Sequence, residues 1–121
     1  MANSYIPRTY KKGAVLLKPQ GFLDGNNVNL VITPADMNLF LQKKIKSVEI
    51  VFTNVVSVNL NAVRFLNDVF EHLYKENMEC FIVNPTKNIR NVFLKLSDRF
   101  FNIIESEEVA SVFCQDNDDN F

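Results

Sequence analysis

The stretch that decides the fold is residues 48–83, VEIVFTNVVSVNLNAVRFLNDVFEHLYKENMECFIV. Its first five residues, 48–52, are rich in β-branched and aromatic side chains, which is typical of a strand. Between residues 62 and 74 the apolar positions recur every three or four residues, and this period predicts an amphipathic helix. Residues 80–83 (CFIV) form a continuous apolar run, as expected of a strand that is covered on both faces. Strand, helix and strand in this order predict a crossover unit with parallel strands.

The segments on either side continue the alternation. Upstream we expect strands at 5–10 and 14–17, the latter interrupted by Pro19 and resuming at 22–23. A helix should begin after Thr33, with Pro34 at its first position, and residues 28–32 are either an irregular lead-in or an earlier helical turn. Downstream we expect a helix at 86–96, a strand at 100–104 and a last helix opening at Ser106.

The predicted fold is therefore α/β, in the order β-β-α-β-α-β-α-β-α, with a mostly parallel sheet flanked by helices. We expect a single domain over residues 1–114, followed by an acidic tail, 115–121, that is loosely held.

The composition of the chain argues against several classes of function. The chain has 121 residues, 47% hydrophobic and 22% charged, with a net charge of −1, so bulk charge steers it neither to nucleic acid nor to an anionic membrane. No apolar run reaches the roughly 20 residues that insertion into a membrane requires. Two cysteines, one histidine and three glycines favour a reducing cytoplasm and supply no metal site or phosphate loop. With no readable nucleophile and base, we expect a protein that is not an enzyme and uses no cofactor.

Residues 21–24 (GFLD), 59–66 (NLNAVRFL) and 80–85 (CFIVNP) resemble three segments of the STAS domain family, whose name stands for sulfate transporter and anti-sigma-factor antagonist. Residues 21–24 (GFLD) resemble the family's G-x-L-D segment, and residues 80–85 (CFIVNP) its strand and N/S-P turn. Residues 59–66 (NLNAVRFL) stand where the family has D-S-S-G-L-x-x-L. The likeness runs from about residue 14 to 113 and implies an SpoIIAA-like sheet with its strands in sequential order.

The departures from that motif concern phosphorylation. Leu60 stands at the family's phosphoacceptor serine, with Asn59, Asn61 and Ala62 in place of its Asp, second Ser/Thr and Gly. Because leucine has no hydroxyl group, the family's phosphorylation switch cannot operate at this position. Ser57 is an alternative acceptor that we do not expect to be used, since a serine there more often makes a turn hydrogen bond.

The resemblance implies a function in bacterial transcription regulation. Small STAS proteins act as anti-sigma-factor antagonists in partner switching, and we expect a protein–protein interaction module that binds an anti-sigma serine kinase constitutively. The alternatives are a STAS subunit that binds the ATPase of a lipid-transport ABC complex, and a sensor of a small ligand.

By the same resemblance, the partner contact would use the loop 55–61 and the exposed side of the helix 62–74. The residues we expect at this interface are Ser57, Asn59, Leu60, Asn61, Arg64, Asp24 and Asn26. A purely structural interpretation stays open, in which Asn59 or Asn61 caps the helix and Asp24 only forms a turn.

Overall fold

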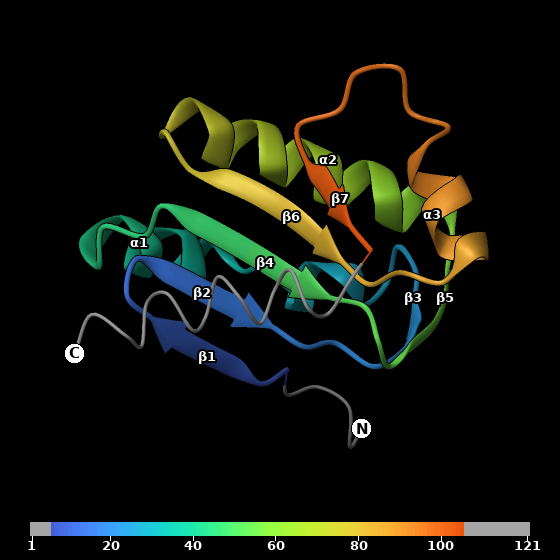
Figure 1. Cartoon of the computed structure of the whole chain (residues 1–121), viewed down its shortest axis with the longest axis horizontal. Coiled ribbons are helices and arrows are strands. Elements are labelled where there is room, and N and C mark those ends of the chain that lie inside the picture. The colour runs from blue at the N-terminus through green and yellow to red at the C-terminus, as the bar shows by residue number, and fades with distance from the viewer. Residues whose placement is uncertain (1–5, 106–121) are drawn as a thin grey trace.

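The main sheet has five strands and confirms the predicted topology (Figure 1). The computed structural model describes residues 6–105. The strands are β1 (Arg8–Lys11), β2 (Ala14–Leu17), β4 (Ser47–Val51), β6 (Glu79–Val83) and β7 (Asn102–Ile104), and they lie side by side in that order. β1 pairs antiparallel with β2 through a turn at Gly13, whose φ of 73° suits glycine. All other neighbours in this sheet are parallel, as crossover connections require.

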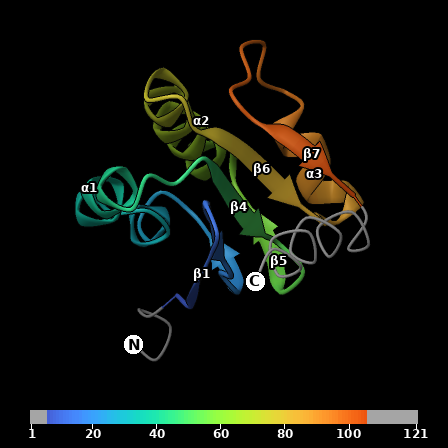
Figure 2. The same ribbon diagram turned by 60° about the vertical axis from the view of Figure 1, so that its left-hand side comes forward.

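One face of this sheet carries the hydrophobic core. Helices α1 (Pro34–Gln42) and α2 (Leu60–Lys75) lie behind the sheet in Figure 1, and Figure 2 shows them on that same side. The strand side chains that point toward them alternate along each strand, so this face is formed by Val15, Leu17, Val48, Ile50, Cys80 and Ile82, all buried. The apolar stripe of α2 packs on these residues, as the sequence period predicts.

A second, two-stranded sheet corrects one prediction. Residues expected as part of a loop form the strand β5 (Val55–Val58), which pairs in parallel with β3 (Gly21–Leu23). β3 is therefore not a continuation of β2 across Pro19 but the start of a separate sheet. Three valines in four residues favour an extended backbone in β5.

The helices begin where their caps predict. The Thr33 side chain accepts a hydrogen bond from the Asp36 N–H, and the Asp36 carboxylate accepts one from the Thr33 N–H, a complete capping box. The undecided segment contains a 3₁₀ helix, η2 (Val28–Leu30). α3 spans Lys87–Phe93, shorter than the predicted 86–96, and α2 starts at Leu60, two residues before the prediction. The helix expected from Ser106 and the acidic tail lie outside the described residues.

The sheet face opposite the helices holds a buried carboxyl group. Glu49 of β4 is only 3% exposed and lies between Leu16 of β2 and Phe81 of β6. Its Oε1 atom has no hydrogen-bond partner within residues 6–105. Burial raises the pKa of Glu49, and the hydrogen bond with Ser47 offsets only part of that effect.

Glu49→Gln is expected to stabilise the protein at alkaline pH. A folded-state pKa above the ordinary 4.5 means that the native state binds more protons than the unfolded chain, so stability falls as pH rises from about 4.5 through the folded-state value. Glutamine cannot ionise, so the stability of the variant relative to the parent should be greater at pH 8 than at pH 4.5. Urea unfolding at pH 4.5 and pH 8 measures the gain. An equal difference between the two proteins at both pH values would contradict the assignment.

Candidate functional site

The residues predicted at the interface gather where β3, β5 and the start of α2 meet. We call this surface the rim; it comprises Asp24, Asn26, Ser57, Asn59, Leu60, Asn61 and Arg64. β3 and β5 run in parallel, so both deliver the chain to the same end of the small sheet. The Asn59 N–H donates to the Leu23 carbonyl oxygen at 3.2 Å, which extends this pairing to the entrance of α2. A methyl group on Gly25 would lie 3.6 Å from the Cβ of Asn61, so the turn after β3 touches the first turn of α2.

The N-terminus of α2 is capped by an asparagine. The Asn59 side-chain oxygen accepts a hydrogen bond from the Ala62 N–H at 2.9 Å, which satisfies one of the unpaired donors of the first turn. Of the two residues considered for this role, Asn59 is therefore the cap. Leu60 follows as the first residue of the helix and is half-buried, while Asn61 is exposed.

The turn after β3 has the hydrogen bonds of an Asx turn. Asp24 Oδ1 accepts from the Asn26 N–H at 2.8 Å and from the Asn27 N–H at 3.2 Å. Asn26 itself is exposed beside these bonds. Asp24 thus shapes the turn that presents Asn26, and the structural interpretation of Asp24 is correct whatever else it contacts.

Ser57 and Arg64 complete the rim from β5 and α2. Ser57 is exposed and lies opposite Phe22 in the β3–β5 register. Arg64 is exposed one turn beyond Leu60 on α2. The seven predicted residues therefore lie in β5, in the first turns of α2, and in the connections that follow β3 and β5.

Two apolar side chains beside the rim were not among the predicted interface residues. Phe22 is 65% exposed on β3, and Val56 is 62% exposed on the neighbouring strand β5. They are the two most exposed large apolar side chains within the described chain. Exposed apolar area bordered by polar groups is the composition of a protein contact surface. Because Phe22 and Leu23 are both apolar, no local pattern in the sequence indicates which of the two side chains is exposed.

Two further observations concern the thiol of Cys80 and the grouping of metal-ligating side chains within residues 6–105. Cys80 is 2% exposed, and burial raises the pKa of its thiol to about 12, so it is an inert core residue. Residues 6–105 contain no group of three or more histidine, cysteine, aspartate or glutamate side chains placed to hold a metal ion. None of the helices in this part of the chain is long and apolar enough to cross a membrane.

The fold agrees with the comparisons to known proteins. The family model for the STAS domain matches residues 5–110, so the chain belongs to the STAS domain family. The anti-sigma factor antagonist SpoIIAA in its unphosphorylated form is a similar solved structure, with a TM-score of 0.67 and 15% identity over 92% of this chain and 98% of that one. A Thermotoga maritima protein assigned as an anti-sigma factor antagonist has a TM-score of 0.68 and 15% identity over 95% and 99% of the two chains. A search of curated protein sequences finds no significant match.

Proposed function

We propose that this STAS domain is a non-enzymatic interaction module of the anti-sigma-factor antagonist type, which binds its protein partner through the rim and the adjacent Phe22 and Val56. The observation that supports this most strongly is the pair of exposed apolar side chains on neighbouring strands. The polar rim residues border this pair, an arrangement typical of a contact surface with an apolar centre and a polar edge.

The proposed partner is an anti-sigma serine kinase, and binding is constitutive. At the entrance of α2 the residue in the acceptor position is Leu60, and the cap hydrogen bond is supplied by the amide of Asn59. A leucine accepts no phosphate, so a kinase that binds here cannot release itself by modifying this position.

Phe22→Ser and Val56→Ser are each expected to weaken partner binding about tenfold or more. A large apolar side chain that is solvated in the free protein and buried in the complex contributes most of the affinity of such a contact. Calorimetric titration with the purified serine kinase encoded nearest to this gene measures the effect. Because both side chains are exposed, neither change should alter the midpoint of thermal unfolding by more than about 2 °C.

A matched control separates the rim from the rest of the surface. Leu41→Ser removes an apolar side chain that is 45% exposed on α1, and it should leave the affinity unchanged. Equal losses in all three variants would contradict the proposed site. Tight binding to the ATPase subunit of a lipid-transport complex, with none to the kinase, would overturn the assigned partner.

A further inference from the structure

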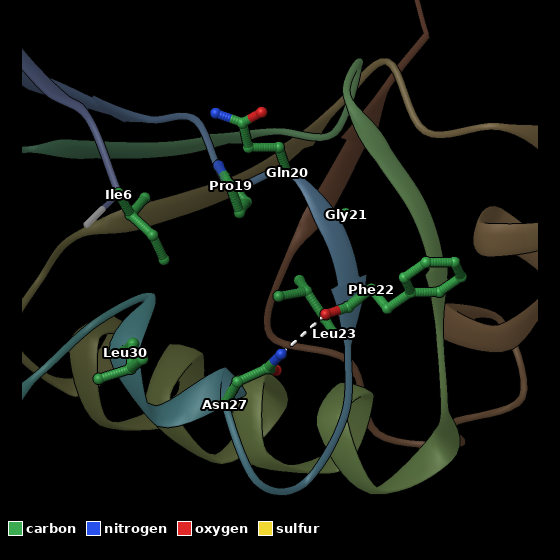
Figure 3. Close-up of a pocket in the computed structure, with 8 residues that line it drawn as sticks. All are labelled: Ile6, Pro19, Gln20, Gly21, Phe22, Leu23, Asn27 and Leu30. Atoms are coloured by element: carbon green, nitrogen blue, oxygen red, sulfur yellow. Dashed lines mark hydrogen bonds between the residues drawn. The ribbon is translucent and has the colours of Figure 1, made fainter. Parts of the chain in front are cut away.

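A groove lies on the opposite side of β3 from β5. β3 pairs with β5 along one edge only, and its other edge borders a groove of about 350 Å³. Figure 3 shows Ile6, Leu23 and Leu30 around this groove, and it shows the ring of Phe22 turned away from them, on the side of β5. The side chains that line the groove carry no charge among the described residues.

The walls of the groove are tied together by one side chain. The Arg8 guanidinium donates to the carbonyl oxygens of Ile6 at 2.5 Å and of Leu30 at 3.2 Å, which belong to the two walls. The same guanidinium forms an ion pair with Asp36 at the start of α1, with Nη2 and Oδ2 2.6 Å apart. Arg8 therefore connects the two walls to each other and to α1 through hydrogen bonds that do not involve β3.

The edge of β3 is closed by the side chain of Asn27. Its amide nitrogen donates to the Phe22 carbonyl oxygen at 2.8 Å, the bond drawn in Figure 3. Its amide oxygen accepts from the Asp24 N–H at 2.9 Å. A residue in an added parallel strand makes the same two bonds, because it donates to one residue of the edge and accepts from the residue two positions further on. The carboxamide of Asn27 thus makes the two hydrogen bonds that the N–H and C=O of one added-strand residue opposite Leu23 would make.

We infer that β3 accepts an extended, uncharged peptide segment of a partner protein as an added parallel strand, and that Asn27 closes this edge in the free protein. The residue opposite Leu23 would replace both bonds of the Asn27 side chain. Its own side chain would lie on the same face as that of Leu23, in the groove beside Ile6 and Leu30. The added strand would use the backbone C=O of Phe22 and the backbone N–H of Asp24, whereas the proposed rim contact uses side chains, so the two proposals are tested by different variants.

The probe for this edge is a blocked, fluorescently labelled heptapeptide in which valine and threonine alternate. Fluorescence anisotropy would measure its binding to the full chain, to Asn27→Ala and to the control Asn91→Ala, which changes an exposed asparagine of α3. Asn27→Ala should bind the probe at least tenfold more tightly than the parent, and Asn91→Ala should match the parent. Equal affinities for all three proteins, or no detectable binding to Asn27→Ala, would overturn the inference.

Methylation of the peptide nitrogens tests the pairing itself. In an added strand only alternate residues direct their N–H toward the edge, and those residues carry the side chains that enter the groove. N-methylation of the valines should abolish binding to Asn27→Ala, and N-methylation of the threonines should leave it intact. Equal binding of both methylated peptides would mean apolar adsorption and would refute strand addition.

A second variant, Asn27→Asp, tests the inference in case Asn27→Ala does not fold. Asn27→Asp keeps the acceptor for the Asp24 N–H and loses the donor to the Phe22 oxygen, so it should bind the probe more tightly than the parent and less tightly than Asn27→Ala. If Asn27→Ala fails to fold, a parent-like affinity of the folded Asn27→Asp would overturn the inference, and a higher affinity would support it.

Discussion

Leu60→Ser is expected to turn this chain into a substrate of an anti-sigma serine kinase, whereas the parent takes up no phosphate. The substitution puts a hydroxyl group at the first residue of a 16-residue helix. There the unpaired N–H groups and the helix dipole stabilise an added phosphate. Incubation with the purified kinase and ATP, followed by intact-protein mass measurement, should show one phosphate group on Leu60→Ser and none on the parent.

The new phosphate should also release the partner. A doubly charged group at the centre of the rim would stand beside the apolar contact made by Phe22 and Val56, and desolvating it is costly. We expect at least about tenfold weaker binding, or about 1.4 kcal/mol. Leu60→Ala is the matched control, because it shortens the side chain without adding a hydroxyl group. Phosphate on Leu60→Ala or on the parent, for example at Ser57, would contradict the assignment of the acceptor position.

Asn67→Ala is expected to lower the free energy of unfolding by about 3 kcal/mol. Asn67 lies on α2 and is 9% exposed. Its amide nitrogen donates to the Asp98 carbonyl oxygen at 2.7 Å, and its amide oxygen accepts from the Phe100 N–H at 3.1 Å. Alanine leaves both backbone groups without their partner in a partly buried position, which costs more than the bonds themselves contribute.

The loss of stability in Asn67→Ala should be greatest in the segment between α3 and β7. That segment delivers Phe101, whose ring lies 5.8 Å from that of Phe70 and 5.2 Å from that of Phe93, measured between centroids. Urea unfolding measures the global loss, and hydrogen exchange at the Phe100 N–H measures the local one. Asn91→Ala on the exposed side of α3 is the control and should change stability by less than about 0.5 kcal/mol. A loss of similar size in both variants would contradict the role of Asn67.

The main sheet could be predicted because its signals are local. The β-branched run of β4 and the helical period of α2 lie within single elements, and Thr33 with Asp36 marks the start of α1 through neighbouring residues. β5 could not be predicted in the same way. Its partner β3 is distant in sequence, and the pairing depends on the placement of both strands by the rest of the fold.

The cap and the turn within the rim could be predicted from the sequence, whereas the exposure of Phe22 could not. Asn59 and Asp24 carry short polar side chains whose capping and turn chemistry is recognisable from their positions. The chain has 11 phenylalanines, and most of those on the apolar faces of helices and strands pack in the core. No local feature of the sequence distinguishes Phe22, which is exposed, from these buried phenylalanines. The role of Asn67 could not be predicted, because a single asparagine beside an apolar stripe resembles a solvated residue. Its hydrogen-bond partners, Asp98 and Phe100, are distant in sequence.

We propose that the rim binds its partner without a phosphorylation switch. The most direct test is calorimetric titration of the full chain with the purified partner kinase, before and after exhaustive incubation with ATP and magnesium, with intact mass recorded on both samples. We predict an unchanged mass and dissociation constants that agree within about twofold. A gain of phosphate on this chain together with loss of binding would contradict the claim.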